Sequence, residues 1–188
     1  LMLYPAIATR LACVLLLVAG GVVPRRLRAD ESASDTSNNK SQMHLKIRLN
    51  ENGDIYYDEL KSLDPATAKA FAESRFAGEF IDLSLNGLTT LDAATAESLA
   101  QFKGSRLFLG GLASIDAHTA AALANSKCRS LELAGLSAVS AESARALAGF
   151  KGSLVLEGLT SLDAPTADHL AKSDAWDGRL PRLSNLDA

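Results

Sequence analysis

The chain repeats one motif, Leu-x-x-Leu-Asp-Ala-x-Thr-Ala-x-x-Leu-Ala, with small variations five times between Leu60 and the C-terminus. The leucine that opens each copy, including a final incomplete one, falls at Leu60, Leu88, Leu112, Leu136, Leu159 and Leu183. Successive copies therefore begin 28, 24, 24, 23 and 24 residues apart. A nearly fixed period of this length is the signature of a fold that stacks one supersecondary unit on the next. This repetition constrains the fold class more than any other feature of the sequence.

Each repeat contains a strand pattern followed by a helix pattern. Upstream of the opening leucine, two apolar residues are separated by one residue, which places both on one face of a strand. These pairs are Ile55 and Tyr57, Leu83 and Leu85, Leu107 and Leu109, Leu131 and Leu133, and Leu154 and Leu156. Downstream the spacing changes to three and four residues, as in Ala96, Leu99 and Ala100, which is typical of a short helix. The capping residues expected before these helices are Asp64, Asp92, Asp116, Ser140 and Asp163.

One repeat of about 24 residues cannot fold by itself, because the few aliphatic groups that it buries do not offset the conformational entropy it loses. Stacked neighbours share each apolar face and align their strands in a parallel ladder. The sequence therefore predicts an α/β fold of about five and a half repeats of 23–24 residues, within a domain at residues 43–188. Since aromatic residues make up 5% of the chain, we expect a core of leucine and alanine.

A glycine precedes the opening leucine in the four middle copies, at Gly87, Gly111, Gly135 and Gly158. The first and last copies have Glu59 and Arg182 at this position. A positive φ would require glycine in every copy, whereas close approach to neighbouring repeats would require it only in internal copies. The pattern therefore favours close approach. In the last copy, Gly178 is expected in place of the first strand leucine, so that Arg179 would follow as an outward-facing residue.

From about residue 54 to residue 188, the pattern Leu-x-Leu-x-x-Leu-x-x-Leu-Asp-x-x-x-Ala-x-x-Leu-Ala resembles leucine-rich repeats, most closely the cysteine-containing subclass. Leucine stands where that subclass has cysteine, at Leu88, Leu112, Leu136 and Leu159. The asparagine ladder of the commoner leucine-rich repeats is absent from the sequence. The resemblance implies a right-handed solenoid of a bacterial exported type, with short parallel strands inside and short helices outside. It also implies a surface that is used for protein recognition.

An unbroken apolar run from Leu11 to Val23 follows Arg10. The run is long enough for the core of a signal peptide and short for a membrane span. We interpret residues 1–29 as a signal peptide or N-terminal anchor, with a passable cleavage site after Ala29. Three arginines after the run oppose translocation, so an uncleaved anchor and an unrelated apolar start remain alternatives to a cleaved signal. We expect an exported protein, whether secreted, periplasmic or attached to the cell surface.

Residues 30–42 (DESASDTSNNKSQ) are almost entirely polar and predict a disordered linker. The alternation of apolar residues across His44–Asp58, with an Asn52-Gly53 step between its two halves, predicts an N-terminal capping hairpin. The same stretch weakly imitates a calcium-binding loop. Because Arg48 would occupy the first ligand position of that loop, the hairpin is the favoured interpretation.

The charge balance of the chain bears on its partners. Four of the 19 basic residues and none of the 22 acidic ones lie within residues 1–29, which leaves the rest of the chain with a net charge of −7. Such an acidic chain lacks the electrostatic footprint of a nucleic-acid-binding protein and is repelled by anionic membranes. We therefore expect no nucleic-acid partner, and membrane contact only through the N-terminal segment if it is not cleaved.

The sequence contains none of the common catalytic or phosphate-binding motifs. His118 and His169 occupy different positions of the repeat, and the repeated aspartates are spaced as helix caps. We therefore expect a non-enzymatic protein without a catalytic, cofactor or metal site. Cys128 would be the one cysteine left after signal removal. We interpret it as a small residue at a helix end rather than as a partner in an intermolecular disulfide.

The strand residues that face away from the core form the candidate recognition surface. Its central positions are Tyr56, Ser84, Phe108, Glu132, Val155 and Arg179. The positions that flank them are Asp82, Arg106, Ser130 and Ser153. Apolar side chains interleaved with charged ones are typical of protein interfaces. The alternative is ordinary variation of solvent-facing strand residues.

Together these features predict an exported, non-enzymatic scaffold that binds an unidentified protein or peptide on a concave strand face. The alternative function is a structural or envelope module whose repeats assemble or space other components. A recognition module is expected to be a monomer, whereas the incomplete last repeat would permit end-to-end association.

Overall fold

The structure is a computed structural model, and it describes residues 48–49, 54–73 and 81–187. The predicted signal peptide or anchor and the predicted linker lie outside the described residues, as does the Asn52-Gly53 turn. Within these ranges, no helix is long and apolar enough to cross a membrane.

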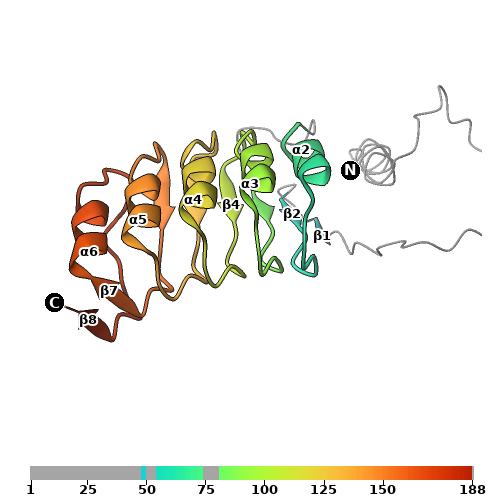
Figure 1. The fold of residues 1–188 in the computed structure, drawn as a ribbon. Coiled ribbons are helices and arrows are strands. Elements are labelled where there is room, and N and C mark those ends of the chain that lie inside the picture. Colours follow the sequence, from blue (N-terminus) through green and yellow to red (C-terminus); the bar gives the residue numbers. More distant parts are fainter. Residues whose placement is uncertain (1–47, 50–53, 74–80, 188) are drawn as a thin grey trace, which may run out of the picture. The chain divides into compact units, whose positions relative to one another are not determined.

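Short strands alternate with short helices along the chain (Figure 1). The strands are β1 (Arg48–Leu49), β2 (Ile55–Tyr56), β3 (Leu83–Ser84), β4 (Arg106–Phe108), β5 (Ser130–Glu132), β6 (Ser153–Val155), β7 (Ser161–Asp163) and β8 (Asn185–Asp187). The helices are α2 (Pro65–Glu73), α3 (Ala93–Leu99), α4 (Ala117–Ala124), α5 (Ala141–Leu147) and α6 (Ala164–Ala171). Strands β1 to β6 form one sheet in chain order, in which β2 to β6 are parallel. The predicted α/β class with parallel strands and alternating helices is confirmed.

The two strands of the predicted N-terminal hairpin pair with each other. Strand β1 runs antiparallel to β2, with Arg48 opposite Tyr56 and Leu49 opposite Ile55. The pairing covers an edge of β2 that would otherwise be open to another strand.

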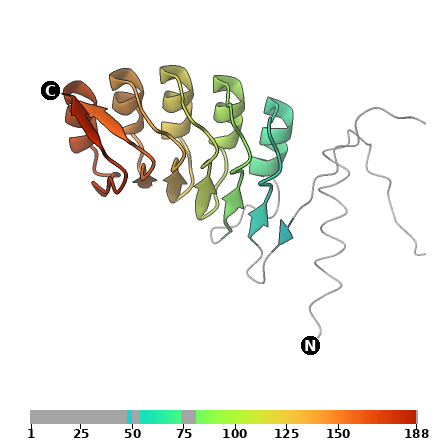
Figure 2. The ribbon, with the colours of Figure 1, turned by 90° about the horizontal axis from the view of Figure 1, so that it is seen from below.

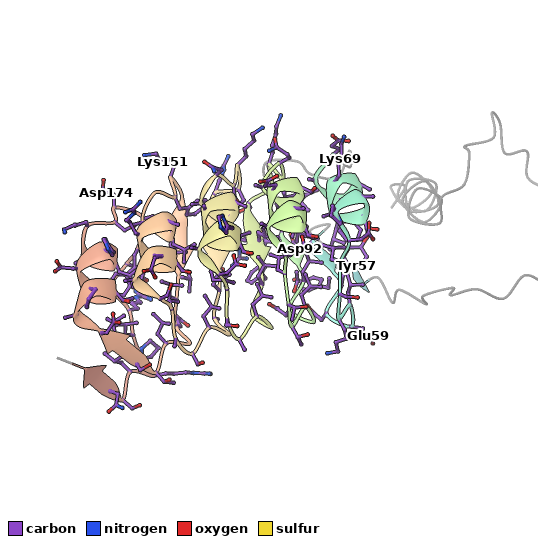
Figure 3. All side chains as sticks on the ribbon, in the orientation of Figure 1. Tyr57, Glu59, Lys69, Asp92, Lys151 and Asp174 are labelled. Atoms are coloured by element: carbon purple, nitrogen blue, oxygen red, sulfur yellow. The ribbon has the colours of Figure 1, made fainter. Side chains whose placement is uncertain are left out.

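The helices all lie on one side of the six-stranded sheet, and each packs against the next helix along the chain (Figures 1 and 2). The layer between sheet and helices is mainly leucine and alanine, as the composition predicts. The opening leucines from Leu88 to Leu159 are fully buried. Aromatic rings contribute at the N-terminal end, where Tyr57 and Phe71 stack with their ring centroids 4.6 Å apart. Tyr57 lies between the sheet and α2 (Figure 3).

The predicted helix caps are confirmed at each of the five helices in the described residues. The side chains of Asp92, Asp116 and Asp163 accept a hydrogen bond from the backbone N–H three residues later, at 2.7, 2.7 and 2.8 Å. Ser140 does the same for α5 at 3.2 Å, and Asp64 caps α2 at 3.0 Å. Asp92 is labelled at the start of α3 in Figure 3. Each cap satisfies a backbone donor that has no partner within its helix.

A ladder of buried hydroxyl groups, which the repeat pattern did not predict, joins neighbouring repeats. Its members are Thr95, Thr119, Ser143 and Thr166, which are at most 1% exposed. Each donates to a backbone carbonyl of the preceding repeat at 3.3 to 3.4 Å, the acceptors being Leu63, Leu91, Ile115 and Val139. The threonine of the motif therefore connects one repeat to the one before it, in addition to starting its own helix.

The corner glycines lie against the backbone of the preceding repeat. A methyl group on Gly135 would overlap the carbonyl oxygen of Gly110, and one on Gly158 would overlap that of Ala134. Gly87 and Gly111 meet the preceding repeat in the same way. Among the described glycines only Gly178 has a positive φ, of 75°. The interpretation of close approach is therefore confirmed.

The register predicted for the last repeat is wrong. Gly178 was expected opposite Leu154, but Trp176 pairs with Leu154 in a parallel bridge. The connection after α6 contains a tight turn, in which the Ser173 hydroxyl accepts a hydrogen bond from the Ala175 N–H at 3.2 Å. The chain then returns to pair β8 with β7, with Leu186 opposite Leu162, in a second parallel sheet that the sequence did not predict.

Candidate functional site

The strand face is the surface of the six-stranded sheet turned away from the helices. The register of β2 to β6 places five of the predicted central residues side by side. In order across the sheet they are Tyr56, Ser84, Phe108, Glu132 and Val155. Residues directly opposite on adjacent strands are close enough for their side chains to touch. The sequence therefore placed five of its six predicted central residues in the row.

Arg179 does not belong to this row. Because Trp176 pairs with Leu154, the residue that follows Val155 in the register is Asp177. Arg179 lies two residues farther along the chain and bonds to Asp177 instead, through its Nε at 3.3 Å and its backbone N–H at 3.0 Å. The prediction of Arg179 as a central residue is wrong, because it depended on an unbroken period.

Ser84 is in the row, but its side chain is occupied within the protein. The residue is 2% exposed, and its hydroxyl donates to Asp58 Oδ1 at 2.5 Å. The hydroxyl also accepts a hydrogen bond from Asn86 Nδ2 at 3.0 Å, and Asn86 Oδ1 accepts one from the Gly110 N–H at 2.7 Å. This network joins three repeats and leaves Ser84 no surface for a partner.

Arg106 is held on the strand face by Asp82 of the preceding repeat. Its Nη2 and Nε lie 2.6 and 2.9 Å from Asp82 Oδ2. The hydrogen bond with Asp82 raises the pKa of Arg106 above its usual value. The guanidinium carbon lies 5.1 Å from the ring centroid of Phe108, in reach of a cation–π interaction. Arg106 and Phe108 therefore have a fixed arrangement before any partner arrives.

Asp82 is the anchor of this arrangement. Its side chain is 9% exposed, and its backbone N–H donates to Asp54 Oδ1 at 3.0 Å. A carboxylate that is this deeply buried is costly without a partner, and Arg106 supplies the compensating charge. The Asp82 end of the pair is therefore buried in the sheet, while the Arg106 side chain, which is 51% exposed, reaches the surface.

Glu132 lies beside Arg106 but is not fully compensated by it. The Glu132 side chain is 23% exposed, and its Oε1 is 4.0 Å from Arg106 Nη1. Burial raises the pKa of Glu132, and the carboxylates of Asp82 and Glu157 raise it further, while Arg106 opposes the shift. Glu132 is consequently a partly buried carboxylate whose negative charge Arg106 balances only in part.

Tyr56, Phe108 and Val155 are each half-buried, so part of every side chain reaches solvent. Ser130 is half-buried and Ser153 is exposed. Along the row, three side chains with apolar contact area alternate with the buried hydroxyl of Ser84 and the carboxylate of Glu132. These side chains stand on short strands that are fixed by neighbours on both sides, which limits the entropy lost on binding.

Neither Cys128 nor the potential metal ligands of the described residues form a reactive arrangement. Cys128 is 5% exposed, and burial raises the pKa of its thiol to about 11. A thiol in this environment stays protonated and unreactive at neutral pH. Across the described ranges, no three His, Cys, Asp or Glu side chains come together in a group that could hold a metal ion.

A shallow groove of about 580 Å³ lies between α3 and α4 on the helix side. Four alanines line it, together with Glu97, Gln101, His118 and Asn125. Gln101 accepts a hydrogen bond from Lys127 at its edge. The groove brings no set of polar groups to one point, so the strand face is the stronger candidate.

The comparisons with known proteins give no assignment. None of the protein-family models matches the chain, and no curated protein matches it either.

Proposed function

We propose that this chain is an exported, non-enzymatic recognition module of the leucine-rich-repeat type, which binds a protein or peptide on its strand face. In this proposal the repeats form a right-handed solenoid, and the strand face is its concave inner surface. The parallel order of β2 to β6, with one helix after each strand, supports the solenoid.

The observation that carries the proposal is the fixed Arg106–Phe108–Glu132 arrangement on the strand face. Aromatic and arginine side chains supply much of the binding energy at protein interfaces. Arg106 and Phe108 are held in place by Asp82 and by each other, which lowers the entropic cost of binding. Tyr56 and Val155 extend the apolar contact area along the same row.

Export rests on the composition of residues 1–29, and it places the partner outside the cytoplasm. The absence of catalytic motifs from the sequence supports a binding role rather than an enzymatic one.

The test is capture of a partner from the extracellular fraction of the source cells. The variant Tyr56→Ser/Phe108→Ser removes both aromatic rings of the row, while the matched control Lys69→Ser/Glu97→Ser changes exposed residues on the helix side. We expect the first variant to fold and to lose at least tenfold in captured protein, and the control to capture as much as the wild type. Equal capture by all three proteins would remove the strand face as the binding site.

The alternative, a module that assembles with copies of itself, predicts a different result. Light scattering over a range of concentrations would then show a mass that rises with concentration. A recognition module of the proposed kind keeps a constant mass.

A further inference from the structure

We infer that the partner of the strand face carries a lysine or arginine between apolar side chains, and that Glu132 receives the cationic group. This inference rests on the proposed function, because it names the partner chemistry of the same surface. We call the receiving site the Glu132 niche and define it by Phe108, Glu132, Val155 and Glu157.

The shape of the niche follows from the strand register. Phe108 and Val155 stand directly on either side of Glu132, on strands that lie about 4.8 Å away. The neighbour of Glu132 on the same face of β5 is Ser130, and the turn after the strand begins with Ala134; both residues are small. The carboxylate therefore lies between two apolar walls, with no large side chain above it along β5.

The charge of the niche favours a cation. Arg106 is bonded to Asp82 at 2.6 and 2.9 Å, whereas its distance of 4.0 Å to Glu132 is too long for a hydrogen bond. Glu157, in the turn after β6, adds a second carboxylate close enough to raise the pKa of Glu132. Three acids thus surround one base, so a cation relieves repulsion and an anion adds to it.

The walls of the niche favour a polypeptide over a small cation. Lysine and arginine have aliphatic stems that lie along apolar surface while their charged ends reach a polar group. Phe108 and Val155 offer that surface next to Glu132, and they also offer contacts for apolar residues on either side of the cation. The carboxylate alone would not distinguish a peptide from an inorganic ion.

Binding of a cation should also depend on pH. The groups that face Glu132 are Arg106, Asp82 and Glu157, and their combined effect with burial is a raised pKa. A bound cation favours the ionised form of Glu132, so affinity should increase as the pH rises through that pKa. Asp82 keeps Arg106 charged throughout this range.

The probe is a fluorescent peptide in which Leu-Lys-Leu is embedded in a glycine–serine chain, and its twin contains Leu-Gln-Leu. A charge-assisted hydrogen bond in this setting corresponds to a preference of about tenfold for the lysine peptide. We expect Glu132→Gln to abolish the preference, because glutamine keeps the shape of the side chain and removes its charge. The control Glu142→Gln removes an exposed acid from α5 and should leave the preference unchanged.

Failure of the inference has a recognisable result. Equal binding of the two peptides by the wild type, no binding of either, or a preference that survives Glu132→Gln would each overturn it. Circular dichroism and the thermal midpoint show that the variant is folded. If Tyr56→Ser/Phe108→Ser loses the natural partner while Glu132→Gln keeps it, the proposed function stands without the niche. If both variants keep the partner, both proposals fail.

Discussion

Single residues in this fold limit which residues can stand beside them, as the turns after α3, α4 and α5 show. A methyl group on Gly104 would overlap the ring of Phe102, and one on Gly152 would lie 2.7 Å from Cζ of Phe150. The middle repeat has Ser126 in place of the phenylalanine, and there Cys128 takes the place of the glycine. Cys128 is therefore a packing residue, which fits its interpretation as a small residue at a helix end.

This exchange predicts a coupled pair of substitutions. Ser126→Phe alone should lower the free energy of unfolding by about 1–3 kcal/mol, because the ring needs the space of the Cys128 side chain. Adding Cys128→Gly should restore most of the loss, and urea unfolding of the four proteins of the cycle measures the coupling. The Ser126 hydroxyl is buried without a hydrogen bond, so the loss of the serine itself costs little. Additive effects of the two substitutions would show that the sites are independent.

At the scale of the element, each helix is tied to its own start and to the repeat before it. Thr119 shows both functions, since its N–H donates to Asp116 at 2.7 Å and its hydroxyl donates to the Leu91 carbonyl at 3.3 Å. The position of the cap could be read from sequence, because capping involves residues three apart. The hydroxyl ladder could not, because it joins residues 28 apart through the stacking of two repeats.

Removal of one rung of the ladder should be measurable. Thr119→Val keeps the shape of the side chain and should cost about 1–2 kcal/mol in the free energy of unfolding, because the Leu91 carbonyl loses a buried donor. The matched control is Thr67→Val in α2, whose hydroxyl bonds to the exposed cap Asp64 at 2.6 Å. We expect the control to cost less than half as much in urea unfolding. Equal costs would mean that the hydroxyl acts only at its own helix start.

The helix caps should make stability depend on pH. The hydrogen bond from the Thr119 backbone N–H holds the pKa of Asp116 below its usual value, and His118 lowers it further. This stabilisation is complete above the unfolded pKa of about 3.9 and is lost as the pH falls through the lower folded value. Asp116→Asn, which still accepts a hydrogen bond but does not ionise, should therefore have a lower thermal midpoint than the wild type at pH 6. The two midpoints should converge near pH 2, and a constant difference would exclude this source of pH dependence.

The last repeat shows where prediction of elements from a period fails. A period of 24 residues from Leu154 leads to Gly178, whereas the paired residue, Trp176, is 22 residues away. The connection between α6 and Trp176 contains a turn at Ser173, and the repeat motif does not predict this turn. The assignment of Arg179 to the candidate site failed for the same reason, although the five other central residues were placed correctly.

For the whole molecule, the sequence predicted which residues share the strand face but not which of them remain available to a partner. Asp82 and Arg106 are 24 residues apart, and Asp58 and Ser84 are 26 apart, yet each pair bonds between adjacent repeats. A periodic sequence pattern shows which residues occupy equivalent positions in successive repeats. It does not show which side chains of neighbouring repeats bond to each other. The central role of Arg106, the burial of Ser84 and the incomplete compensation of Glu132 all depend on such contacts.

Because the helices stack in chain order, the region that a core substitution destabilises should depend on the position of that substitution. Leu131 in β5 and Leu170 in α6 are both fully buried, so substitution of either by alanine should cost about 3 kcal/mol. Leu131 has paired strands on both sides, through β4 and β6, whereas α6 packs against α5 as its neighbouring helix in the described part of the chain. Hydrogen exchange should therefore show lost protection on both sides of β5 in Leu131→Ala. In Leu170→Ala the loss should be concentrated in α6 and β6, with β3 and β4 still protected. An equal loss of protection throughout the sheet in both variants would show that the repeats unfold as a single unit, and stability would then not divide between neighbouring repeats.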